Sequence, residues 1–269
     1  MLSDKERVIL ANTDVFSQTR GIPEASVQRN SEGGYLILVD VHLFRFIFSL
    51  TKCILPVLKG SGSSCFVDIK LNGLRKSVKA ACEVGRFYGV LWQYLAMGGT
   101  FDGMIQEHSI QDTPAFGSFD HHLLAQTVAN LEQFIIAHEI AHVLLGNTGQ
   151  LSKRDEEFEA DALALELVLR TTGKHRFLNM PEAAPWRMEG ALMLLSFLEF
   201  LEKCAKIQLD GSDDQHPSAS ERIENLAQRR SMDLMFRIDI VRLGLPTDTH
   251  AFSITPAVRR FLAEAAEFL

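Results

Sequence analysis

The stretch "FIIAHEIAHVLL", residues 134–145, carries two histidines and a glutamate in an otherwise apolar sequence. A helix that is apolar all round is normally buried, and polar side chains in such a setting are costly unless something satisfies them. On a helix, His138 and His142 lie about 40° apart on one face, with Glu139 at the edge of the same arc. The stretch therefore predicts a buried helix whose three polar side chains share a partner.

The H-E-x-x-H spacing of these side chains is typical of a zinc site. Two imidazoles four residues apart can bind one Zn²⁺, while the glutamate faces the water that completes the site. The alternative is that both histidines are hydrogen-bonded core residues and Glu139 is their buried partner. Because the stretch has no other polar residue, we favour the metal, with His138 and His142 as ligands and Glu139 as the general base.

A third zinc ligand has to come from elsewhere in the chain. A metzincin would have glycine at position 145 and histidine at position 148, where this chain has Leu145 and Thr148. The next predicted helix, "KRDEEFEADALALELVLR" over 153–170, offers carboxylates instead. The third ligand is therefore expected among these acids.

Helical periodicity distinguishes the acids of this second helix. With Glu157 as the origin, Asp161, Ala164 and Val168 fall within about 40° of it at 100° per residue, whereas Glu156 lies off that arc. We assign Glu157 as the third ligand, and Asp161 as the acceptor for the second ring N–H of a ligand histidine. The alternative is an acid pair bridged to another helix. Like charges at this spacing repel, so a cation is needed in either case.

Three motifs in this order resemble those of the glutamate-zincin (gluzincin) metallopeptidases. H-E-I-A-H is followed by E-F-E-A-D-A-L-A and then by "HPSASERIENL" (216–226), which is similar to the H-P-x-x-x-x-R-I segment of one branch. The resemblance covers about 130–226 and is closest to the HtpX/CAAX-protease-like branch and the Lit-type phage-exclusion peptidases. HtpX-like proteins carry clear transmembrane helices, and this chain departs from them because it has no clear span.

The resemblance implies zinc bound by the two histidines and Glu157, with Glu139 as the base. It also implies that His216 or Arg222 contributes to the edge of the active site. Taken alone, His216 could equally belong to a helix cap that follows an acidic loop. Arg222 could simply pair with a neighbouring acid, so both interpretations stay open.

The expected function is that of a zinc-dependent endopeptidase acting on a specific intracellular protein, as in phage defence or a stress response. One alternative is an ImmA/IrrE- or CapP-type protease that cleaves a DNA-bound repressor, since those proteins share the two helical motifs. The H-P-x-x-x-x-R-I segment favours the first. A second alternative is a non-catalytic zinc-binding module. Its site would be closed by a fourth ligand such as Cys82 or His108, which could also act as a reversible plug.

Composition excludes several other classes of protein. The 269 residues are 46 % hydrophobic and 23 % charged, as in ordinary globular proteins, and the net charge of −7 gives no strong nucleic-acid signature. Four cysteines without a C-x-x-C pair indicate neither a disulfide framework nor a thiolate metal site. Charged residues interrupt the most lipid-like segment, 35–58, and no signal peptide is visible. These features predict a cytoplasmic protein and leave the oligomeric state open. The protein or peptide substrate is what the motifs and the resemblance imply.

The pattern of elements predicts an α+β fold that is predominantly α-helical. Residues 1–34 are expected to form an N-terminal arm or peripheral helix, and 35–269 a single metallopeptidase-like domain. Expected strands lie at 35–41 and 65–71. Expected helices lie at 42–58 and 75–97, in a catalytic pair over about 120–173, and in a C-terminal part over 187–269.

Overall fold

The computed structural model describes residues 4–18, 25–61, 77–88, 118–146, 152–170, 183–205, 217–236 and 255–267. The described residues are mainly helical with one small sheet, which confirms the predicted α+β class. The helices are α1 (Asp4–Ala11), α2 (Val41–Ser61), α4 (Ser118–Leu145), α5 (Lys153–Arg170), α6 (Ala183–Ala205), α7 (Ala219–Phe236) and α9 (Thr255–Glu267), with a further helical segment over 77–88.

The sheet consists of β1 (Thr13–Gln18), β2 (Ala25–Arg29) and β3 (Tyr35–Asp40) in the order β1-β3-β2. β3 pairs parallel with β1 and antiparallel with β2. Two of the three strands therefore come from residues 1–34, where we expected an arm or a peripheral helix. β1 is exposed along most of its length, so it lacks the apolar alternation that marks a strand. The strand expected at 65–71 lies outside the described residues.

A short turn connects β2 to β3 and fixes their register. Gly33 adopts a φ of +83°, a conformation that favours glycine, and the Asn30 side chain accepts hydrogen bonds from the backbone N–H groups of Glu32 and Gly34. The resulting register places Arg29 opposite Tyr35. These two residues lie on the sheet face that also carries the partly buried Val27.

Asp40 ends β3 and caps α2 directly. Its buried carboxylate accepts a hydrogen bond of 2.7 Å from the backbone N–H of His42, as an N-cap residue does. We expected this helix to end near Pro56, but α2 continues to Ser61. Pro56 has no backbone N–H to donate to the helix, and α2 continues past it despite the missing hydrogen bond.

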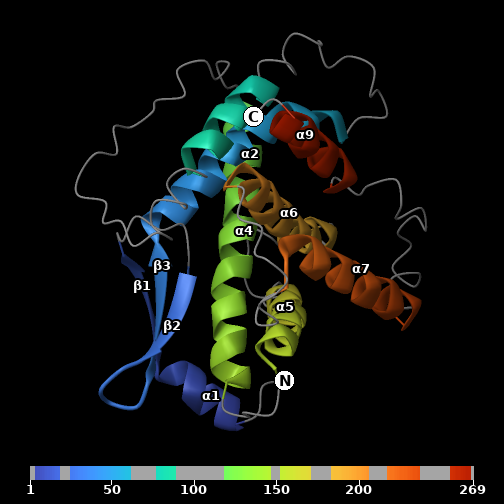
Figure 1. Ribbon diagram of the computed structural model, residues 1–269. Coiled ribbons are helices and arrows are strands. Elements are labelled where there is room, and N and C mark those ends of the chain that lie inside the picture. Colours follow the sequence, from blue (N-terminus) through green and yellow to red (C-terminus); the bar gives the residue numbers. More distant parts are fainter. Residues whose placement is uncertain are drawn as a thin grey trace.

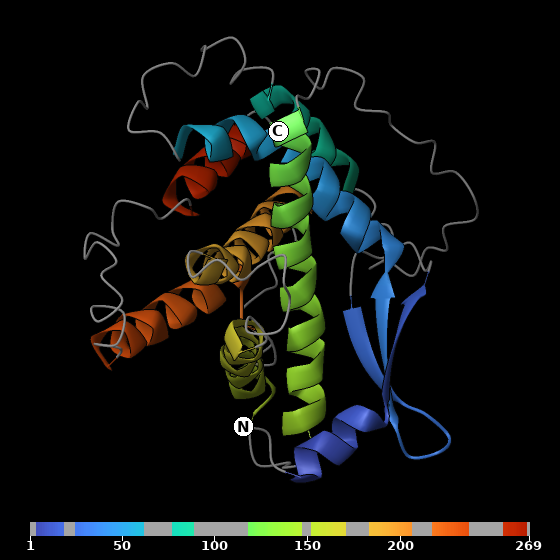
Figure 2. The same ribbon diagram turned by 180° about the vertical axis from the view of Figure 1, so that it is seen from behind.

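Helix α4 lies in the middle of the molecule, with the sheet and α1 on one side of it and α5, α6 and α7 on the other (Figures 1 and 2). Leu131, Phe134 and Ala141 are almost completely buried along this helix, as its apolar sequence predicts. None of the described helices combines the length and the apolarity needed to cross a bilayer. The histidine motif thus sits on a helix packed from both sides.

Ser152 caps α5, as its sequence suggests. Its hydroxyl accepts a hydrogen bond from the backbone N–H of Asp155 at 3.1 Å and donates one to the Asp155 carboxylate at 2.7 Å. Replacing Ser152 with alanine should lower the free energy of unfolding by about 1 kcal/mol, measured by urea denaturation. Ser152→Thr keeps the hydroxyl and should stay close to the wild type; an equal loss in both variants would contradict the cap.

Candidate active site

His138 and His142 on α4 and Glu157 on α5 bring their ligand atoms together between the two helices. His142 Nε2 lies 3.0 Å from His138 Nε2 and 3.4 Å from Glu157 Oε1, and His138 Nε2 lies 3.4 Å from Glu157 Oε2. The three side chains are only 12 %, 20 % and 14 % exposed, in that order along the chain. The structure therefore places the three residues expected as metal ligands in one cluster.

These distances fit a single small cation. In a tetrahedral zinc site, with bonds of about 2.1 Å, neighbouring ligand atoms are roughly 3.4 Å apart. The atoms offered by His138, His142 and Glu157 all lie within 4.8 Å of one another. Two imidazole nitrogens and one carboxylate are also the donor set of catalytic zinc sites, so the residues present fit this metal.

Asp161 supports the cluster from the next turn of α5. Its carboxylate is 1 % exposed, and Oδ1 lies 3.0 Å from His138 Nδ1. This short distance pairs the buried carboxylate with the second ring nitrogen of His138. The sequence predicted that Asp161 would accept a hydrogen bond from a ligand histidine, and the structure places it beside His138.

Arg222 reaches the same carboxylate from α7. Its Nε and Nη2 donate hydrogen bonds of 2.8 and 2.7 Å to the two oxygens of Asp161, and its Nη1 lies 3.4 Å from Glu157 Oε2. A bidentate pairing of this kind is strong and directional. Arg222 therefore joins α7 to the acids of α5 at the edge of the ligand cluster.

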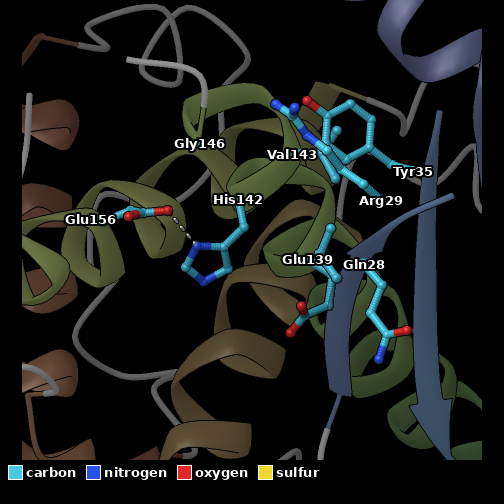
Figure 3. A pocket seen from close by; sticks show the side chains of 9 residues that line it. Gln28, Arg29, Tyr35, Glu139, His142, Val143, Gly146 and Glu156 are labelled. Atoms are coloured by element: carbon cyan, nitrogen blue, oxygen red, sulfur yellow. Dashed lines mark hydrogen bonds and ion pairs between the residues drawn. The ribbon is translucent and has the colours of Figure 1, made fainter. Parts of the chain in front are cut away.

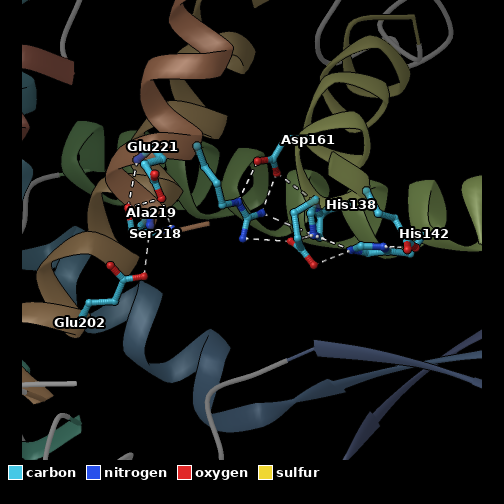
Figure 4. A network of polar contacts seen from close by, with 10 residues as sticks. His138, His142, Asp161, Glu202, Ser218, Ala219 and Glu221 are labelled. Atoms are coloured by element: carbon cyan, nitrogen blue, oxygen red, sulfur yellow. Dashed lines mark hydrogen bonds and ion pairs between the residues drawn. The ribbon is translucent and has the colours of Figure 1, made fainter. Parts of the chain in front are cut away.

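The position of Arg222 follows from the way α7 begins. The Ser218 hydroxyl accepts from the backbone N–H of Glu221 at 3.3 Å, and the Glu221 carboxylate accepts from the backbone N–H of Ser218 at 2.9 Å (Figure 4). This reciprocal pair is a capping box. Glu202 of α6 accepts a further bond from the Ala219 N–H. The "PSASER" part of the third motif thus starts a helix at a fixed place beside the cluster.

The charges of the cluster are strongly coupled. Burial alone would raise the pKa of Asp161, but Arg222 and His138 hold it below its usual range, and His138, His142 and Arg222 do the same for Glu157. Burial would lower the pKa of His138, but contacts with Asp161 and Glu157 raise it to about 9. Two carboxylates face one guanidinium, so the site favours positive charge at the histidines, which a ring proton or a metal ion can supply.

Glu139 lines a pocket beside the cluster rather than joining it. The pocket has a volume of about 370 Å³ and is bounded by α4, the start of α5 and strand β2; its lining residues include Glu139, His142 and Glu156 (Figure 3). Glu139 is 8 % exposed, and burial raises the pKa of its carboxyl. A carboxylate with a raised pKa next to the ligand cluster is suited to accept and return a proton.

Glu156 has a role that the helical periodicity did not indicate. Its Oε1 lies 3.2 Å from His142 Nδ1, so it is the partner of the second ring nitrogen of His142 (Figure 3). Helical periodicity placed Glu156 away from the buried face of α5. Its side chain is long enough, however, to reach α4 from the first turn of α5. The end of α4 and the start of α5 are close in the sequence, and this closeness could have indicated that Glu156 contacts His142.

Two of the expected site residues, His216 and His108, lie outside the described residues. Cys82 lies on the helical segment 77–88, and the part of the chain that the structure describes adds no fourth histidine, cysteine or carboxylate to the group of three ligands.

Residues 122–235 match the model of a peptidase family, Peptidase U49. The match covers less than half of the chain, yet it runs from α4 into α7 and includes the ligand cluster, Glu139, Asp161 and Arg222. It supports a peptidase function. Comparisons with curated proteins and with solved structures found no match.

Proposed function

We propose that the protein is a zinc-dependent endopeptidase that hydrolyses a peptide bond in a specific protein substrate. The observation that carries the proposal is the convergence of His138, His142 and Glu157 within 4.8 Å, with Glu139 in the adjoining pocket. The match to a peptidase family supports the class of reaction. The geometry supports the metal, because it fits tetrahedral coordination by two nitrogens and one oxygen.

Different residues of the chain have different roles in the proposed hydrolysis. Zinc, when bound, would act as a Lewis acid that activates water and polarises the peptide carbonyl near neutral pH. Glu139 takes the proton from the attacking water on its carboxylate and returns it to the leaving amine. Asp161 and Glu156 hold the rings of His138 and His142 through the Nδ1 atoms, so that both Nε2 atoms face Glu157, where these three residues would hold the metal.

Strand β2 supports the binding of an extended peptide. It is an edge strand of the described sheet and lines the pocket with Val27, Gln28 and Arg29. The backbone groups of an edge strand can pair with an added peptide strand, which gives affinity without dependence on sequence. We expect the scissile bond to lie between this edge and Glu139.

The resemblance to Lit-type peptidases extends the proposal to a biological role. A peptidase of that type cleaves a particular host protein during phage infection, and the pocket between strand β2 and helix α4 would suit a narrow, regulated specificity of this kind. The alternative substrate is a DNA-bound repressor, because proteases that cleave such repressors share the two helical motifs.

Removal and return of the metal test the proposal. The purified full-length protein should contain zinc in a one-to-one ratio, measured by elemental analysis, and should cleave peptides of a proteome-derived library. A chelator should abolish cleavage, and zinc should restore it, whereas magnesium should not, because imidazole ligands suit zinc and magnesium prefers oxygen. Cleavage that persists after complete removal of zinc would contradict the proposed mechanism.

A further inference from the structure

The pocket beside the cluster has two chemically different ends. Glu139 and Glu156 provide acids on the helix side, whereas Arg29 is the one arginine or lysine among the described residues that line it. Figure 3 shows the Arg29 side chain together with Tyr35 near Val143, while the Glu139 carboxylate points to another part of the pocket. A substrate that fills the pocket therefore meets an acid where the reaction occurs and a guanidinium at a distance from it.

The fold fixes the place of this guanidinium. Arg29 and Tyr35 are register partners on β2 and β3, and the Arg29 Cζ lies 5.6 Å from the centre of the Tyr35 ring. The turn that joins the strands, with Gly33 at positive φ and the Asn30 side chain bonded within it, keeps this register. A side chain that lies over a ring loses less freedom when it binds a ligand than one that moves in solvent.

The chemistry of this pair selects a carboxylate. The ring contacts the face of the guanidinium, whereas hydrogen bonds to a carboxylate use the N–H groups in its plane, in a bidentate geometry. A lysine or arginine of the substrate would be repelled at this end of the pocket.

We propose that Arg29, held over Tyr35, forms a substrate subsite that binds a carboxylate, so that cleavage requires an acidic group at a fixed distance from the scissile bond. This inference rests on the proposed peptidase function and adds the substrate class to it. The carboxylate can belong to an aspartate or glutamate within the substrate or to its C-terminus. Both sources present the same group to Arg29.

Cleavage-site profiling tests the subsite. Zinc-loaded full-length protein digests a proteome-derived peptide library, and mass spectrometry reads the residues around each cut. Wild type should show aspartate or glutamate enriched at one fixed position, and Arg29→Glu should shift that preference to lysine or arginine. On a matched peptide with glutamate at that position, kcat/KM should fall by about tenfold or more in Arg29→Glu, mainly through KM. Cleavage at a fixed distance from the C-terminus, lost on C-terminal amidation, would identify the terminal carboxylate as the bound group.

The control variant is Arg260→Glu. It makes the same charge change on an exposed part of α9, which does not line the pocket, and its profile should equal that of the wild type. Binding of the same peptides to the inactive Glu139→Gln protein, measured by fluorescence polarisation, should show the same preference for the acid. Cleavage without any acid preference, or an unchanged profile in Arg29→Glu, would overturn the subsite alone. A wild-type protein that cleaves no peptide would overturn the peptidase function and the subsite with it.

Discussion

Glu139→Gln should bind zinc and fold like the wild type, yet lose peptide hydrolysis by roughly 10²–10⁴-fold. The side chain keeps its size and its place in the pocket, where it is 8 % exposed, but glutamine cannot accept the proton of the attacking water. Zinc content should not change, since Glu139 is not one of the three grouped ligands. The measurements are kcat/KM on a cleaved peptide, zinc per chain and the urea midpoint.

A matched control lies on the same helix. Glu132 of α4 is partly buried, and burial raises the pKa of its carboxyl as it does for Glu139, but Glu132 does not line the pocket. Glu132→Gln should therefore retain hydrolysis. Equal loss of activity in both variants would attribute the effect to the stability of α4, and near-normal cleavage by Glu139→Gln would refute its assignment as the base.

The ligand cluster was predictable because its information is local. His138 and His142 share one helix face by their spacing, and Glu157 shares the buried face of the next helix with Asp161, Ala164 and Val168. The last three are between 0 % and 3 % exposed in the structure. A short connection between two buried helices makes their polar residues meet, so periodicity was sufficient to bring these residues together.

The sheet could not be predicted in this way. β1 pairs with β3 across more than twenty intervening positions, and its exposure gives no alternation in sequence. In β2, the apolar residues Ala25 and Val27 are partly buried, but a strand of five residues is too short for a clear pattern. The pocket depends on this pairing, because β2 forms one of its walls. The wall of the pocket that β2 forms could therefore not be predicted from the sequence.

Arg222 was predictable only in part, unlike the ligand cluster, which was predictable, and the sheet, which was not. Its motif was visible, but the carboxylate that it binds lies 61 positions away in the sequence, and no local rule connects the two. The structure shows a buried network in which the guanidinium faces both Asp161 and Glu157. This arrangement predicts that the helix–helix connection, and not only the active site, depends on Arg222.

Arg222→Met should lower the free energy of unfolding by about 3–5 kcal/mol, because it removes the cation from two buried acids and leaves them uncompensated. The matched control is Arg229→Met on the same helix. Arg229 pairs with Glu159 of α5, as Arg222 pairs with Asp161, but that pair is 35 % and 44 % exposed, so its loss should cost about 0–1 kcal/mol. Urea denaturation of both variants with a chelator present separates this effect from zinc binding.

The pH dependence gives the same prediction a second test. Asp161 has a pKa below its usual range in the folded protein, so its pairing with Arg222 stabilises the fold fully above the unfolded pKa of about 3.9. That stabilisation is lost as the pH falls through the folded value. The difference between wild type and Arg222→Met should therefore persist from neutral pH down to about pH 5 and decline only in stronger acid. Similar losses for the Arg222 and Arg229 variants, or a difference that disappears at neutral pH, would contradict a buried ion pair that holds α7 to α5.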